Sequence, residues 1–224
     1  MARTPAERDA IRSRFAAVDT SNAADALDEI GLPDQGLHPG LAALSGDRLA
    51  GWAFTVAGVM APYEGTGDPA KMRACSQVGP GEVTVWAGEG EGICYFGELI
   101  ALAMAERGAV GALVDGGVRD LKWLRRHGFP VFARYRTPVQ SIGRWKVTAA
   151  QQPVHLPGAT SARVTVHPGD FVLADEDGAL VVPDAAVDRV LARAEELTRT
   201  EVRIREAIAD GVSLQECLER FGHV

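Results

Sequence analysis

Hydrophobic and polar positions follow two different periods along this chain, and each period predicts its own kind of element. Apolar residues spaced three and four apart indicate a helix with one buried face, whereas strict alternation indicates a strand. The helical pattern covers residues 5–18, a segment from the N-cap formers Thr20–Asn22 to Gly31, 71–78, 98–107, 121–128, 184–209 and a last short helix that includes Leu214, Cys217, Leu218 and Phe221.

The strand pattern is clearest at 50–59, where Trp52, Phe54 and Val56 alternate with smaller residues. Stretches rich in Gly and Pro predict loops between the periodic segments. Further strands are predicted at 83–88, 109–115 and 129–136 and in several pieces of 144–182, with a turn at Gly116–Gly117 and loops at 32–46, 61–69 and 88–96.

The order of these elements predicts the fold class. Helices and strands alternate in the middle of the chain, and strands cluster after residue 144. This order favours a mixed α/β fold with antiparallel pieces over a regularly alternating parallel sheet. No internal repeat or linker interrupts the 224 residues, a length that one α/β domain can reach. We therefore expect a single domain over 1–224, with a helical C-terminal segment at about 184–224.

Composition restricts the partners and the location. A net charge of −7 argues against nucleic acid, which binds through Lys and Arg side chains that neutralise phosphates. The charged N-terminus has no apolar run typical of a secretory signal, and no stretch approaches the ~18 apolar residues that a membrane span needs. The three cysteines have no CxxC spacing, which indicates reduced thiols. We expect a cytoplasmic protein without a membrane or nucleic-acid partner.

Gly97, Glu98 and Leu99 open a predicted helix and form the first candidate site. A helix start has unpaired N–H groups and the positive end of the helix dipole, so it attracts carboxylates and phosphates. Gly97 also lacks a side chain that would crowd a ligand. The alternative interpretation is a glycine cap, with the Glu98 carboxylate stabilising the first helical turn.

Arg119 and Asp120 form the second candidate site, after the predicted strand 109–115. The planar Arg guanidinium suits a carboxylate or an enolate oxygen, and an Asp carboxylate suits Mg²⁺ or Mn²⁺. Alternatively, Asp120 caps the helix that follows it. Asp115 either joins the same site or closes the turn.

Other kinds of chemistry lack support in the sequence. The five histidines show no HxxxH or HxH pair, which argues against a histidine metal centre. There is no GxSxG motif and no cysteine with an evident base, so covalent hydrolase chemistry is not indicated. The run GEGEG at 88–92 lacks the Lys-Ser/Thr of a nucleotide loop and predicts a flexible loop beside the site. The charges of 184–209 predict a solvated helix face or a subunit contact.

Over nearly its whole length the chain resembles the RraA-like family, which includes divalent-metal-dependent 4-hydroxy-4-methyl-2-oxoglutarate / 4-carboxy-4-hydroxy-2-oxoadipate aldolases. The block Gly97–Asp120 is the most diagnostic part. The resemblance implies an α/β, three-layer β/β/α swivelling-type fold and a homotrimer, sometimes stacked into hexamers, with sites at subunit clefts. It is carried by DTSNAADALDEIG, LAGWAFTV, PGEVTVWAG, GELIALAMAERGAVGALVDGGVRD, GFPVFARYRTP and HPGDFVLADEDGALVVP.

The resemblance also implies roles for individual residues. The backbone amides of Gly97, Glu98 and Leu99, together with the side chain of Arg119, would hold pyruvate. Asp120 would bind the divalent metal, Mg²⁺ or Mn²⁺, directly. Glu98 would act near the metal through water, so that Arg119, Glu98 and Asp120 form the catalytic set.

Two positions depart from the aldolase pattern, and a third role is open. Glu98 stands where the aldolases usually carry Asp, and Trp123 stands where another branch of the family carries an acidic residue. Some aldolases also receive a carboxylate from a neighbour's C-terminal helix. Glu195, Glu196 and Glu201 are equal candidates for that carboxylate here.

The resemblance predicts a metal-dependent carbon–carbon lyase that forms a pyruvate enolate by retro-aldol cleavage of a 4-hydroxy-2-oxo acid. Oxaloacetate decarboxylation is the expected side activity, because it forms the same enolate. Two alternatives stay open: a non-enzymatic regulator that binds a ribonuclease, and a metal-dependent decarboxylase or dehydratase of another 2-oxo or sugar acid. The sequence does not rank the substrates, because loops 32–46 and 61–69 are expected to form the far side of the pocket.

Overall fold

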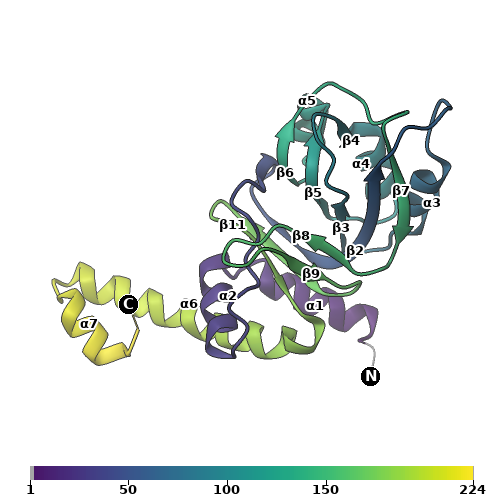
Figure 1. Ribbon diagram of the computed structural model, residues 1–224. Coiled ribbons are helices and arrows are strands. Elements are labelled where there is room, and N and C mark those ends of the chain that lie inside the picture. The colour runs from purple at the N-terminus through teal and green to yellow at the C-terminus, as the bar shows by residue number, and fades with distance from the viewer. Residues whose placement is uncertain (1–2, 224) are drawn as a thin grey trace.

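A computed structural model describes residues 3–223, and a nine-stranded mixed sheet is the centre of that part of the chain (Figure 1). The strand order along the main path is β1-β6-β5-β3-β2-β10-β11, with β4 added beside β5 and β7 beside β2. The strands are β1 (Ala42–Ser45), β2 (Leu49–Met60), β3 (Glu82–Ala87), β4 (Cys94–Phe96), β5 (Gly111–Val118), β6 (Val131–Arg136), β7 (Trp145–Ala150), β10 (Phe171–Asp175) and β11 (Gly178–Val182), while β8 (Val154–Leu156) and β9 (Val164–Val166) pair separately.

Parallel and antiparallel pairing occur in the same sheet. Strands β2, β3, β5 and β6 pair in parallel, whereas β1, β7 and β10 are antiparallel to their neighbours. The prediction of a mixed α/β fold with antiparallel pieces is therefore confirmed. In the described range, no helix is both long enough and apolar enough to cross a bilayer.

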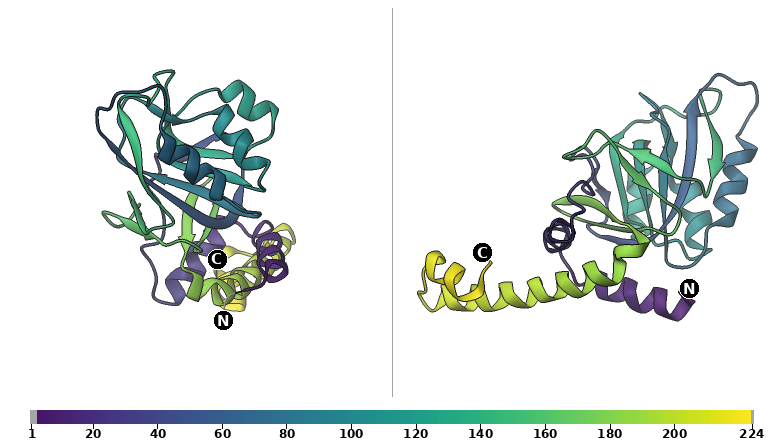
Figure 2. Two further views of the ribbon diagram at one scale, coloured as in Figure 1. Left: turned by 90° about the vertical axis from the view of Figure 1, so that its right-hand side faces the viewer. Right: turned by 60° about the horizontal axis from the view of Figure 1, so that its bottom comes forward.

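The helices form two groups around the sheet (Figures 1 and 2). Helices α3–α5 share an apolar core with β3, β5 and β7, and helices α1, α2 and α6 share another with β10 and β11. The end of α6 and all of α7 project away from the sheet. The helices are α1 (Pro5–Phe15), α2 (Thr20–Glu29), α3 (Pro69–Gln77), α4 (Glu98–Ala105), α5 (Leu121–Arg126), α6 (Val187–Ala209) and α7 (Leu214–Phe221), with a short 3₁₀ turn at Asp184–Ala186.

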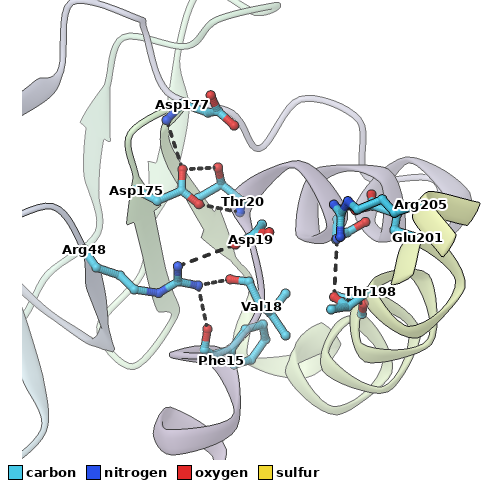
Figure 3. Close-up of polar contacts among 12 residues, drawn as sticks. Phe15, Val18, Asp19, Thr20, Arg48, Asp175, Asp177, Thr198, Glu201 and Arg205 are labelled. Atoms are coloured by element: carbon cyan, nitrogen blue, oxygen red, sulfur yellow. Dashed lines mark hydrogen bonds and ion pairs between the residues drawn. The ribbon is translucent and has the colours of Figure 1, made fainter. Parts of the chain in front are cut away.

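Helix α2 begins earlier than the sequence pattern predicts. Asp19 occupies the N-cap position, and the predicted N-cap formers Thr20–Asn22 lie inside the helix. Thr20 instead donates hydrogen bonds to the Asp175 carboxylate, from its amide at 2.8 Å and from its hydroxyl at 2.6 Å (Figure 3). Arg48 donates to the carbonyl of Val18 nearby. The Thr20 side chain therefore binds β10, which is distant in sequence, and does not cap α2.

Three predicted irregular segments contain strand. Strand β1 lies in the predicted loop 32–46, and β4 lies in the predicted loop 88–96. Gly116 and Gly117 belong to β5 and do not form the predicted turn. The Tyr95 hydroxyl packs so closely that a Cβ on Gly116 would lie 2.2 Å from it. These glycines are therefore explained by close packing and not by a change of chain direction.

Aromatic side chains beside β7 pack against Tyr95, which lines the cavity of the candidate site. Trp145 stacks on Tyr95, with 4.3 Å between the ring centres, and lies beside Trp86. A Cβ on Gly58 would lie 1.9 Å from the Trp145 ring, so only glycine leaves room for this indole.

Candidate active site

A cavity of about 330 Å³ lies where two strand-to-helix junctions meet. Gly97 links β4 to α4, and Arg119–Asp120 links β5 to α5; all three residues line the cavity. Strands β4 and β5 are parallel neighbours, so the carboxyl ends of both strands meet here. Ligand sites of open α/β sheets form preferentially at such ends, and the volume suits a small metabolite.

Gly97 brings the start of α4 close to Asp120. The Glu98 amide donates to Asp120 Oδ2 at 3.4 Å, and a Cβ on Gly97 would lie 2.7 Å from the same oxygen. The Gly97 backbone is extended, with φ −170°, so any residue type could adopt it. Glycine is therefore required here because a side chain would collide with the Asp120 carboxylate. The next amide, that of Leu99, is one of those that helix geometry leaves unpaired.

Asp120 has a left-handed backbone, with φ +64°, which is unusual for a residue other than glycine. It occupies the N-cap position of α5, yet its side chain makes no capping hydrogen bond to that helix. Asp120 therefore caps α5 by its position and its backbone carbonyl, while its carboxylate takes no part in capping. Strained backbone of this kind costs on the order of 1–3 kcal/mol and is concentrated at functional sites. The carboxylate is partly exposed, at 38 %, and faces α4.

Arg119 reaches the same cavity with most of its hydrogen-bond donors free. Its amide donates to the Phe96 carbonyl at 3.1 Å, which joins the two junctions. Within residues 3–223, its guanidinium has one ion pair, from Nε to Asp120 Oδ2 at 3.5 Å. The remaining N–H groups of the guanidinium can therefore bind an anionic ligand.

The Glu98 side chain points elsewhere. Its Oε1 lies 3.5 Å from His127 Nε2, in a smaller hollow beside Phe129. The structure thus brings together Gly97, Leu99, Arg119 and Asp120 but leaves the Glu98 carboxylate outside the cavity lining. A role for that carboxylate near the metal stays a prediction and requires it to leave His127.

Asp115 takes neither of its two predicted roles. It is 2 % exposed inside β5 and lies 2.7 Å from Arg134 Nε. Burial raises the pKa of the Asp115 carboxyl, and the Arg134 charge opposes that shift. Arg134 also binds Glu91 of the 88–92 loop at 2.7 Å. Asp115 therefore belongs to a structural ion-pair group in the sheet.

Lys71 is a charged residue of this cavity that the sequence patterns did not single out. Its side chain comes from α3 and lines the cavity, although the residue is only 8 % exposed. Burial lowers the pKa of the ammonium to about 8, and the Arg119 charge acts in the same direction. The sequence did contain a signal for this burial. Lys71 shares one helix face with Ala74 and Cys75, both of which are buried.

Asp68 fixes α3 where it presents Lys71. Its carboxylate accepts from the amides of Ala70 and Lys71 at 3.0 and 3.2 Å, which caps the helix. The second oxygen accepts from the Val147 amide of β7 at 2.7 Å. The predicted contribution of loop 61–69 is confirmed, since Asp68 lines the cavity, but loop 32–46 of the same copy lines none of it.

Cys94 lines the cavity but does not have the character of a nucleophile. It is 4 % exposed, and burial raises the pKa of its thiol. The thiolate is the reactive form of cysteine, so burial disfavours reaction at neutral pH.

The donor atoms at Asp120 fit Mg²⁺ or Mn²⁺ better than zinc. Residues 3–223 contain no group of three His, Cys, Asp or Glu side chains that could enclose a metal ion. Magnesium keeps several waters and often binds proteins through one or two carboxylates, whereas zinc sites need three or four protein ligands. A single partly exposed carboxylate at the edge of the cavity meets the magnesium requirement.

Fold and cavity together define a class of protein: a mixed α/β chain whose pocket lies at the start of a helix and is lined by two carboxylates, one guanidinium and one ammonium. A family model described as "RraA-like: Aldolase/RraA" matches residues 20–181. The chain belongs to the RraA-like family, and its predicted fold is confirmed. The single domain over 1–224 stays a prediction.

Individual relatives agree with this assignment. The chain is 28 % identical to Protein DlpA of Legionella pneumophila. The match covers 91 % of this chain but only 32 % of the Legionella protein. It is also 28 % identical to a Halalkalibacterium halodurans protein provisionally named 4-hydroxy-4-methyl-2-oxoglutarate aldolase, covering 94 % of this chain and 95 % of that one. The structure of Streptomyces coelicolor RraAS2, described as an unusual member of the RNase ES inhibitor RraA family, aligns with a TM-score of 0.75 and 27 % identity over 88 % of this chain and 96 % of the other.

Gly97→Ala is expected to weaken the predicted binding of pyruvate, and the predicted binding of Mn²⁺, about tenfold or more. The new methyl group would meet the Asp120 carboxylate at 2.7 Å, and either that carboxylate or α4 must move. Calorimetric titration of both ligands checks this. Gly128→Ala, where nothing lies within 4 Å of the new Cβ, controls for glycine replacement as such. Unchanged affinity in Gly97→Ala would show that the close approach has no functional role.

Proposed function

We propose that this chain is a divalent-metal-dependent lyase that cleaves a 4-hydroxy-2-oxo acid by a retro-aldol reaction and releases pyruvate. The observation that supports it most is the Asp120 carboxylate, which is held in a strained backbone, is not used as a cap and lies beside the free donors of Arg119. The aldolase name of the Halalkalibacterium relative points to the same reaction class.

The cavity residues match the charge that this reaction creates. Cleavage removes the proton of the C4 hydroxyl, breaks the C3–C4 bond and leaves the electron pair in the pyruvate enolate, which is then protonated at C3. Arg119 and the amides of Glu98 and Leu99 would hold the C1 carboxylate and offset the charge that grows on the C2 oxygen. A preorganised donor of this kind contributes about 3–4 kcal/mol to the stability of a transition state.

Asp120 would hold the cation. A divalent cation bound there would supply a Lewis acid for the carboxylate and carbonyl oxygens of the 2-oxo acid. Oxaloacetate decarboxylation forms the same enolate, so the same residues would support it as a side reaction.

The experiment is a coupled assay of pyruvate release from 4-hydroxy-4-methyl-2-oxoglutarate and from oxaloacetate. We expect turnover with Mg²⁺ or Mn²⁺, its loss in EDTA and its return when metal is added in excess. Turnover that persists unchanged in EDTA, with metal removal verified by elemental analysis, would contradict the proposed metal dependence.

A second candidate function follows from the structural neighbour. The Streptomyces protein is described as belonging to a ribonuclease-inhibitor family, so a binding role for this chain is the alternative. Inhibition of a ribonuclease by a preparation that releases no pyruvate from any 2-oxo acid would favour that role.

We also propose that the chain self-associates, as a trimer or hexamer. The projecting end of α6 and helix α7 (Figures 1 and 2) supports this, because Ile208, Leu214 and Leu218 on it are 43–59 % exposed. Contiguous exposed apolar side chains commonly mark contact surfaces. The three candidate glutamates already have Arg partners in the single chain: Glu195 with Arg14, Glu196 with Arg193 and Glu201 with Arg205.

A further inference from the structure

We propose that Lys71 is the counter-ion for a second carboxylate of the substrate and that Tyr63 completes this subsite in the part of the cavity next to α3. The inference rests on the proposed function in one respect: Arg119 and the start of α4 are taken to hold the first carboxylate. It adds a substrate-selecting residue to the site.

The first support is a largely buried lysine side chain whose ammonium has neither a hydrogen bond nor an ion pair among the described residues. Lys71 is 8 % exposed, and within residues 3–223 its side chain has no hydrogen bond and no ion pair. Its ammonium lies 5.6 Å from the centre of the Trp86 ring and 5.8 Å from that of Trp145. Two indole faces offset only part of the hydration that a cation loses on burial. An anion that enters the cavity would supply the missing partner.

The second support is a polar atom of another element. Tyr63, from the loop before α3, lines the same cavity, and its hydroxyl is buried without a hydrogen-bond partner among the described residues. Buried hydroxyls are nearly always hydrogen-bonded, so an unsatisfied one beside a cavity indicates a missing acceptor. A carboxylate has two oxygens and could accept from the ammonium and the hydroxyl together.

The third support is the distribution of charge around one small space. Arg119 and Lys71 both border the cavity of about 330 Å³, and the charge of Arg119 is felt at Lys71. The Arg119 guanidinium is already beside Asp120, whereas Lys71 has no ion pair in the described part of the chain. The Asp68 carboxylate acts on Lys71 electrostatically, but its oxygens already accept from the backbone amides of α3 and β7. A ligand with one carboxylate could neutralise one of these cations only. A 2-oxo acid with a carboxylate at each end could neutralise both.

The test compares two five-carbon 2-oxo acids that differ at the far end. 2-Oxoglutarate carries a second carboxylate where 2-oxovalerate carries a methyl group. Their dissociation constants are measured by calorimetry with Mn²⁺ present, for the wild type, Lys71→Met and Tyr63→Phe. Lys146→Met removes an exposed lysine near the cavity and is the matched control for loss of one positive charge.

We expect the wild type to bind 2-oxoglutarate ten- to a hundredfold more tightly than 2-oxovalerate, the range typical of a charged hydrogen bond in a dry site. Lys71→Met should remove this preference while 2-oxovalerate affinity changes less than twofold. Tyr63→Phe should reduce the preference several-fold, and Lys146→Met should keep it. If Lys71 had only a structural role, its substitution would instead weaken the binding of both acids equally.

Two results would overturn the inference: a wild type that does not distinguish the two acids, or a Lys71→Met variant that distinguishes them as the wild type does. Because binding is measured without turnover, the result is separate from the lyase assay. A protein that prefers 2-oxoglutarate through Lys71 but releases no pyruvate would disprove the proposed reaction and leave the subsite intact.

Discussion

Asp120→Asn is expected to lower kcat/KM for metal-dependent pyruvate release by about 10²–10³-fold, the equivalent of about 3–4 kcal/mol of lost transition-state stabilisation. The amide keeps the shape of the side chain and can still accept from the Glu98 amide. It loses the negative charge that is proposed to hold the cation. Asparagine tolerates a left-handed backbone, so the φ of +64° at this position should persist.

The control for this variant is Asp28→Asn, which neutralises an exposed carboxylate of α2. It should retain wild-type kinetics. Thermal unfolding should show that Asp120→Asn is folded, and Mn²⁺ titration followed by electron paramagnetic resonance should show loss of the tight site. Full activity in Asp120→Asn would refute the assignment of Asp120 as the metal ligand.

Lys71→Met is expected to raise the free energy of unfolding by about 1–3 kcal/mol at pH 7, because methionine fills the space between the two tryptophans without a charge to desolvate. For a chain of this length, such a gain corresponds to several degrees in Tm. The same substitution should remove the preference for a second carboxylate. The wild-type protein would thus retain a destabilising lysine for the sake of binding.

The pH dependence of this stability difference has a defined sign. The pKa of Lys71 is lowered from 10.5 to about 8 in the folded protein, so the folded state binds this proton less tightly than the unfolded state. The penalty is complete below about pH 8 and is relieved as the pH rises towards 10.5. The advantage of Lys71→Met over the wild type should shrink over that interval. Calorimetric melting at several pH values measures it, with Lys146→Met expected to stay near the wild type.

A Lys71→Met protein that melts below the wild type would show that the ammonium has a favourable partner in solution. That outcome would also remove the argument that the cavity holds an unpaired cation. The stability measurement therefore checks, without any ligand, the premise on which the second subsite rests.

Local sequence signals predicted most of the helices because a helix satisfies its own hydrogen bonds. Helix α6 was predicted from the spacing of Val187, Val190, Leu191, Ala194 and Leu197, all of which are buried. Short strands were missed for the converse reason. Strand β1 exists because Ala42 and Ala43 pair with β6 some ninety residues away, and no local pattern contains that information.

For the candidate site too, the sequence predicted some features and only the tertiary structure showed the others. The sequence alone identified Gly97, Arg119 and Asp120 as candidate site residues, because they fall in the one block Gly97–Asp120 that is most diagnostic of the family. Only the tertiary structure showed that Asp120 faces α4 and that the Glu98 carboxylate turns to His127. These orientations depend on backbone angles and on neighbours from other elements.

Lys71 is the clearest example of a residue whose environment the sequence did not predict. In the sequence it is a charged residue at the start of a short helix, where lysine is normally solvated. In the folded chain, Gly58 makes room for Trp145, Trp145 and Trp86 enclose the ammonium, and Asp68 fixes the helix that carries it. The sequence by itself determined the family and the types of side chain at the site. The tertiary structure decided which charges are buried together, because burial is a property of contacts between segments distant along the chain.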